Sequence, residues 1–67
     1  MYSLIDKEVF KKYNKTQSAR IIGIDPATLN RIVSGKQRCS KLVAYAITKF
    51  LNANAEIEEY FTYKKGE

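Results

Sequence analysis

The chain has 67 residues, which suffices for one small domain and excludes multidomain enzymes, large barrels and doubly wound sheets. Twelve basic and seven acidic residues give a net charge of +5, which favours an acidic partner, with nucleic acid ahead of an anionic membrane surface. One cysteine and no histidine exclude an internal disulfide, a Cys/His zinc site and a histidine-based catalytic relay. No apolar run has the length of a membrane span or an export signal, so we expect a reduced, cytoplasmic protein without a cofactor.

The basic residues are concentrated in the middle of the chain. Between residues 11 and 41 there are eight basic residues and one acid, Asp25, a net charge of +7. The eight are Lys11, Lys12, Lys15, Arg20, Arg31, Lys36, Arg38 and Lys41. Because ordinary solvated surfaces mix both signs of charge, this segment predicts contact with a polyanion.

Capping residues and apolar spacing predict two helices in the first third of the chain. Ser3 can cap a helix that reaches Lys12, and Asn14 with Gln17 has the form of a capping box for a second helix that Gly23 ends. The first helix would have an apolar stripe of Ile5, Val9 and Tyr13, and the second would turn Ala19 and Ile22 inward.

Three further helices are predicted after Gly23. Asp25 and Pro26 are typical of a helix start, and Gly35 of a helix end. Ser40 can cap a fourth helix and Asn54 a fifth. The expected inward residues are Leu29, Ile32 and Val33 in the third helix, Leu42, Val43, Ala46, Ile47, Phe50 and Leu51 in the fourth, and Ile57 and Phe61 in the fifth.

No segment alternates with a period of two, so the sequence predicts no strand. We therefore expect an all-α fold, a compact bundle of five short helices in a single domain of residues 1–63, followed by a frayed tail at 64–67. The second and third helices, joined by three residues that begin with Gly23, have the geometry of a helix-turn-helix. The outer face of the third would present Ala27, Thr28, Asn30, Arg31 and Ser34, which suits a helix in the major groove.

This part of the chain resembles the helix-turn-helix of the phage Cro/cI repressor (XRE-like) family. The resemblance rests on Ala19, on Gly23-Ile24-Asp25-Pro26-Ala27-Thr28-Leu29, on Ile32 and on Ser34-Gly35-Lys36. It extends over nearly the whole chain, because the family too has five short helices with the motif in the second and third, which implies a lambda-repressor-like fold. Ser18 stands where the family usually has leucine, so docking of the second helix would rely on Ile21 or Tyr13.

The resemblance implies which residues contact DNA. The family's base-facing positions correspond to Pro26, Ala27, Thr28 and Arg31. Of these, Arg31 is the best candidate for a contact to guanine. The family's phosphate-contacting positions correspond to Ser34, Lys36 and Arg38. Thr16 and Gln17 lie two residues later than the family's usual pair, so we move that phosphate contact to Asn14 and Lys15. Asn30 and Gln17 complete the set of candidates, and the N-termini of both helices would also hold phosphates.

Other patterns in the sequence admit two interpretations. Glu56, Glu58 and Glu59 could support acid/base chemistry, but they fit better as acids at a helix start, so we expect no enzyme. Cys39 could be redox-active beside Arg38 and Lys41, or a small residue in a joint. The aromatic residues of the last helix could finish the core or form a self-association surface; these are Tyr60, Phe61 and Tyr63.

The sequence thus predicts a double-stranded-DNA-binding, repressor-like transcriptional regulator from a phage or other mobile element in a bacterial cell. Its operator would be palindromic, and the protein a weak or DNA-induced homodimer, with no membrane and no small-molecule substrate as partner. The alternative is a protein-interaction module, an antirepressor or inhibitor, built on the same fold.

Overall fold

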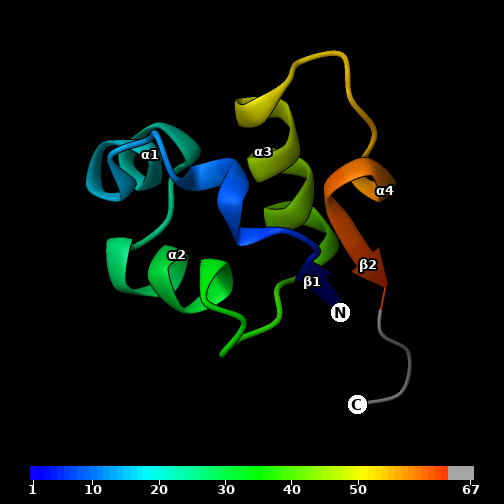
Figure 1. The fold of residues 1–67 in the computed structure, drawn as a ribbon, viewed down its shortest axis with the longest axis horizontal. Helices are drawn as coiled ribbons and strands as arrows, with labels where there is room; N and C mark the ends of the chain where they lie inside the picture. Colours follow the sequence, from blue (N-terminus) through cyan, green and yellow to red (C-terminus); the bar gives the residue numbers. More distant parts are fainter. Residues whose placement is uncertain (64–67) are drawn as a thin grey trace.

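A computed structural model describes residues 1–63, and the predicted tail at 64–67 lies outside the described residues. In chain order the elements are strand β1 (Tyr2–Leu4), the 3-10 helix η1 (Lys7–Phe10), helices α1 (Lys15–Ile22), α2 (Pro26–Val33), α3 (Lys41–Leu51) and α4 (Ile57–Tyr60), and strand β2 (Phe61–Tyr63). Helices α1 and α2 lie on one side of α3, and α4 with β2 lies on the other (Figure 1).

The prediction of an all-α bundle of five helices is wrong, because the two ends of the described chain form an antiparallel two-stranded sheet. Tyr2 is paired with Tyr63, Ser3 with Thr62, and Leu4 with Phe61. Aromatic and β-branched residues favour strands, but each strand has three residues, too few to establish a period of two. The pairing joins segments at opposite ends of the described chain, which local periodicity cannot reveal.

The predicted first helix is replaced by β1 and one turn of 3-10 helix. Ser3 lies within β1, and Asp6 caps the turn instead, its carboxylate accepting a hydrogen bond of 2.9 Å from the backbone N–H of Glu8. The predicted apolar stripe does not form, since Ile5 is 57% exposed and the buried side chain is that of Phe10.

The predicted fifth helix is shortened to the single turn α4. Its N-cap is Glu56 and not Asn54, and the backbone N–H of Glu56 donates to the carboxylate of Glu59 at 2.9 Å. Asn54 belongs to the preceding turn, where its N–H donates to the side chain of Asn52. After Tyr60 the backbone becomes extended and continues as β2.

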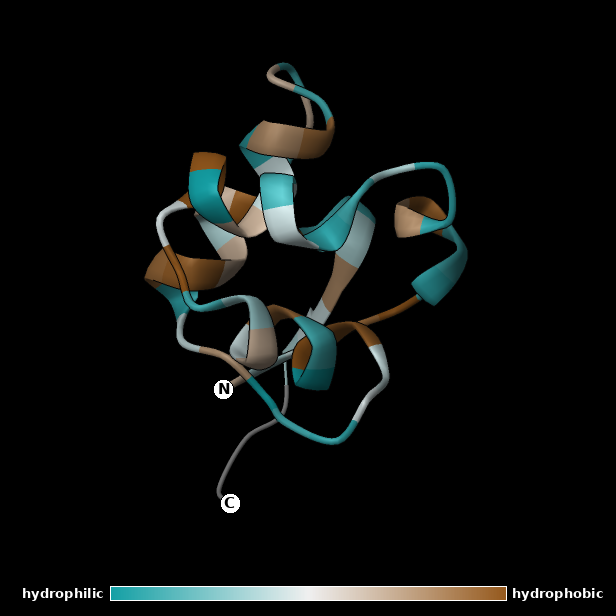
Figure 2. Ribbon diagram, turned by 90° about the vertical axis from the view of Figure 1, so that its left-hand side faces the viewer, coloured by the Kyte–Doolittle hydropathy of each residue, from teal (hydrophilic) through white to brown (hydrophobic). Residues whose placement is uncertain are grey.

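The core lies where α1, α2 and α3 meet the sheet and α4, and each helix combines hydrophobic and hydrophilic residues (Figure 2). The buried apolar residues are Phe10, Ala19, Leu29, Ile32, Val33, Cys39, Ala44, Ile47, Ala55, Ile57 and Phe61. In α3, Ile47 is buried as predicted, and Val43, Phe50 and Leu51 pack against the core as predicted. The exception is Leu42, which is 78% exposed, while Ala44 and Thr48 are buried although they were not predicted to be. Spacings of three and four residues fit several faces of this apolar helix, so the pattern alone does not fix the edges of the buried face.

The helix–joint–helix at the centre of the chain forms as predicted. Asn14 caps α1, Asp25 caps α2, and Pro26 occupies the first helical position of α2. At Gly23 the backbone is left-handed, with φ of 96°, and the N–H groups of Gly23 and Ile24 both donate to the carbonyl of Ala19. This turn ends α1 and directs the chain into α2, which packs against α1.

We predict that Gly23→Ala lowers the free energy of unfolding by about 1–2 kcal/mol, the cost of a left-handed backbone for a residue with a Cβ. No atom lies within 4 Å of where that Cβ would be, so the cost comes from the backbone and not from a clash. Gly23→Asn should cost less, because asparagine tolerates this conformation. Urea unfolding measures both, and equal stability of wild type and Gly23→Ala would contradict the described turn.

Candidate nucleic-acid interface

Helix α2 has one buried and one exposed face. Leu29, Ile32 and Val33 are buried as predicted, and they hold the helix against the core. The exposed residues lie at intervals of three and four on the opposite side; they are Ala27, Asn30, Arg31 and Ser34. Thr28 is half-buried at the border of the two faces, and Pro26 is half-buried at the helix start. The outer face therefore presents small, polar and basic side chains and no acid.

Arg31 is the central charged group of this face, and two neighbours hold its guanidinium. Its Nε donates to Oε1 of Gln37 at 2.8 Å, and its Nη2 donates to Oγ1 of Thr28 at 3.3 Å. The hydroxyl of Ser34 donates to the backbone carbonyl of Arg31 at 3.2 Å, so Ser34 is also held next to Arg31. The side chains of Thr28, Arg31 and Gln37 thus form one hydrogen-bonded cluster on the surface of α2.

Gln37 is not among the residues predicted from the sequence. It lies beyond the end of α2, and the left-handed backbone of Gly35, with φ of 85°, returns the chain towards the helix. The N–H groups of Lys36 and Gln37 both donate to the carbonyl of Arg31, at 2.9 and 3.2 Å. The signal for this contact was present in Gly35, but a glycine indicates a turn and not which later side chain the turn brings back.

The N-termini of the two helices are already occupied by protein groups. The carboxylate of Asp25 accepts hydrogen bonds from the N–H groups of Ala27 and Thr28, at 3.0 and 3.3 Å. A phosphate at the start of α2 would meet this negative charge, which disfavours the phosphate contact expected there. At α1 the cap is the neutral side chain of Asn14, whose Oδ1 accepts from the N–H of Gln17 at 3.1 Å.

The remaining basic and polar candidates flank α2. Lys15 begins α1 and is half-exposed, and Gln17 is exposed in the same turn. Lys36 is exposed directly after α2, and Arg38 is half-buried in the joint that leads to α3. These side chains come from the two ends of the helix pair, so they extend the charged surface beyond the outer face of α2.

Ser18 does not weaken the docking of α1 in the way that the sequence suggested. Its side chain is buried next to Ala19, where a small residue allows close packing of the helix. Tyr13 packs against the core beside Phe10 and Phe50, whereas Ile21 is 72% exposed and takes no part in docking. Of the two residues expected to replace the family's leucine, only Tyr13 is in a position to do so.

The three aromatic residues of the predicted self-association surface have different environments. Phe61 is 2% exposed and belongs to the core, so its assignment to a self-association surface is wrong. Tyr60 is half-buried and packs against the same core. Tyr63 is 59% exposed, and its ring makes an edge-to-face contact with that of Tyr2, with centroids 5.2 Å apart.

Cys39 is a packing residue in the structure. It is buried, and its backbone pairs with that of Tyr2 through hydrogen bonds of 2.7 and 2.8 Å. Burial raises the pKa of the Cys39 thiol to about 11, an effect larger than the opposing one of the N-terminal ammonium group. The thiol is therefore protonated at neutral pH, which favours the packing interpretation over the redox one.

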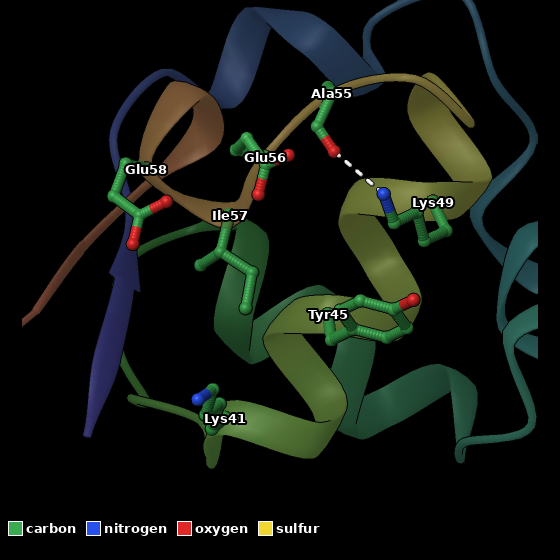
Figure 3. Close-up of a pocket in the computed structure, with 7 residues that line it drawn as sticks. All are labelled: Lys41, Tyr45, Lys49, Ala55, Glu56, Ile57 and Glu58. Carbon is green, nitrogen blue, oxygen red and sulfur yellow. Dashed lines mark hydrogen bonds between the residues drawn. The ribbon is translucent and has the colours of Figure 1, made fainter.

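A pocket of about 220 Å³ lies between α3 and the segment that enters α4 (Figure 3). It is lined by Lys41, Tyr45, Lys49, Ala55, Glu56, Ile57 and Glu58. Lys49 lies 5.3 Å from the ring centroid of Tyr45, and its ammonium donates to the carbonyls of Ala53 and Ala55 at 3.3 and 2.9 Å. Lys49, which belongs to α3, therefore holds the turn that follows α3 against the end of α3.

No protein-family model, curated protein or solved structure matches the chain. Within residues 1–63, no helix is long and apolar enough to cross a membrane. The same residues bring together no group of three His, Cys, Asp or Glu side chains that could hold a metal ion.

Proposed function

We propose that the chain is a sequence-specific double-stranded-DNA-binding transcriptional regulator, repressor-like in type, whose helix α2 enters the major groove. The observation that carries the proposal is the outer face of α2, which exposes Ala27, Asn30, Arg31 and Ser34 around a guanidinium held in place. An α-helix fits the major groove, and amide and guanidinium groups match the edges of adenine and guanine. The protein would act in the cytoplasm of a bacterial cell and belong to a phage or other mobile element.

The distribution of charge supports the same proposal. Helix α2 lies within the segment of net charge +7, and Lys36 and Arg38 follow its C-terminal end while Lys15 begins α1. Contacts to phosphates on both sides of the groove fix the register of a recognition helix without reading sequence. The basic residues at the ends of the helix pair suit this role, with Asn14 and Gln17 as polar neighbours.

Two copies of the chain would bind together. A single module of this kind buries roughly 600–1,000 Å² on DNA, a small area for selective binding at physiological salt. A two-fold pair would place α2 of each copy in half-sites one helical turn apart, which requires a palindromic operator. Tyr63 is the exposed member of the predicted self-association surface and remains its candidate contact in a weak or DNA-induced homodimer.

A second candidate function is a protein-interaction module, an antirepressor or inhibitor. The observation that favours it is the exposure of Leu42 and Tyr45, three residues apart on one side of α3. These apolar side chains play no part in the proposed contact of α2 with DNA. Binding to DNA and its dependence on salt distinguish the two functions.

We predict that selection from a random duplex pool recovers a palindromic site, and that binding to it weakens steeply with salt. With about five to eight phosphates neutralised per dimer, log K should fall against log salt with a slope of roughly −4.5 to −7. Measurements of affinity between low and moderate salt give this slope. A flat titration, or a pool that yields no common site, would contradict the proposal and favour the protein-interaction module.

Substitutions at Arg31 and Lys36 separate base contacts from phosphate contacts. Arg31→Ala should cost on the order of 1–3 kcal/mol on the selected site and relax the preference at one base pair. Lys36→Ala removes the same charge from the phosphate side and should weaken binding to all sequences about equally. Affinities for the site and its single-base variants measure both effects. If Arg31→Ala weakens every sequence alike, Arg31 contacts only phosphate.

A further inference from the structure

The hydrogen bonds of Arg31 determine which part of its guanidinium is left for a ligand. A guanidinium has five N–H groups, and two adjacent ones are needed for a bidentate contact to O6 and N7 of guanine. One such pair consists of Nε and Nη2, along the side of the group, and the other of Nη1 and Nη2, at its end. The 2.8 Å bond from Nε to Gln37 closes the side pair to any base.

Three N–H groups of Arg31 remain after both contacts are made. Thr28 accepts from one N–H of Nη2, which leaves the other N–H of Nη2 and both of Nη1, so each of the two nitrogens at the end of the group keeps a donor. Arg31 is exposed, whereas Thr28 and Gln37 are half-buried, so two partly buried residues support a guanidinium that is itself exposed. Two hydrogen bonds hold the planar group in place, and its remaining N–H groups are left to bind a ligand.

Gln37 is well suited to this supporting role because its own position is fixed. Its backbone N–H donates to the carbonyl of Arg31 at 3.2 Å, and its side-chain oxygen accepts from the guanidinium of the same residue. Gln37 thus contacts both the backbone and the guanidinium of Arg31. The two contacts restrict the rotamers that the long side chain of Arg31 can adopt. Fixing a side chain before binding removes part of the entropy that its immobilisation on DNA would otherwise cost.

We propose that Gln37 is a positioning residue that, with Thr28, holds Arg31 so that its end pair of N–H groups reads one guanine in the major groove. This inference rests on the proposed function. It adds that the base contacted by Arg31 is guanine, and that recognition of this base depends on Gln37, a residue outside α2. The selectivity for guanine at that base pair is then a property of the cluster Thr28, Arg31 and Gln37. Gln37 itself need not touch DNA.

The test uses the full chain and the selected duplex, with the base pair read by Arg31 identified from Arg31→Ala. Gln37→Met keeps the length of the side chain and removes the acceptor, and it should lower the preference for guanine at that pair about 2- to 10-fold. Preferences at the other base pairs should stay unchanged. Gln37→Glu restores an acceptor and should retain the guanine preference, while its negative charge weakens binding to every sequence.

Gln17→Met makes the same chemical change at the chain's only other glutamine, which is a candidate phosphate contact. It should weaken binding to all sequences about equally, if at all, and its guanine preference at the Arg31 pair should equal that of wild type, whereas Gln37→Met should lower that preference. A second readout needs no DNA: in wild type the Nε proton of Arg31 should exchange with water more slowly than that of the exposed Arg20, and Gln37→Met should abolish the difference.

The outcomes separate this inference from the proposed function. If wild type selects a site but Gln37→Met leaves its base preferences unchanged, the positioning role of Gln37 is overturned and the proposed function stands. The inference is likewise overturned, and the proposed function stands, if the pair read by Arg31 prefers a base other than guanine. If wild type selects no site, both the inference and the proposed function are overturned, even where slow exchange of the Arg31 proton confirms the cluster itself.

Discussion

The left-handed turn at Gly23 is the constraint on which the arrangement of α2 depends. Two successive N–H groups donate to the carbonyl of Ala19, so α1 ends there and the chain leaves it in a single direction. That direction brings Leu29 and Ile32 of α2 into the core, and burying them fixes the rotation of the helix about its axis. The exposed face of α2 is then determined by the residues that remain, and Arg31 is its central charged group.

How much could be predicted from the sequence depends on how far each interaction reaches along the chain. The caps of α1, α2 and α3 and the turn at Gly23 involve close neighbours in the sequence, and they form as predicted. The pairing of β1 with β2 joins the two ends of the described chain, and three residues per strand give no readable period. The contact of Gln37 with Arg31 is intermediate in sequence separation. Gly35 indicates a turn, but only the geometry of the turn shows that it brings the side chain of Gln37 back to Arg31.

Charge and packing act on different parts of this small fold. The apolar residues of α1, α2 and α3 meet in one core closed by the sheet and α4, while the basic residues of the middle segment stay on the surface. Asp25, the one acid of that segment, caps α2 and offsets the positive end of the helix dipole, whereas the basic residues Arg31, Lys36 and Arg38 all lie at or after the C-terminal half of α2. This distribution supports the proposal that phosphates are bound around the C-terminal half of α2.

If the protein binds DNA as proposed, the outer face of α2 and the residues flanking it make the contact. Backbone amide NMR shifts, followed during titration of the protein with duplex DNA, locate the contact surface residue by residue. We expect the largest changes within residues 26–38 and in the first turn of α1, with small ones in α4 and the sheet. Largest changes around Leu42 and Tyr45 of α3, or none at any residue, would contradict the proposed contact.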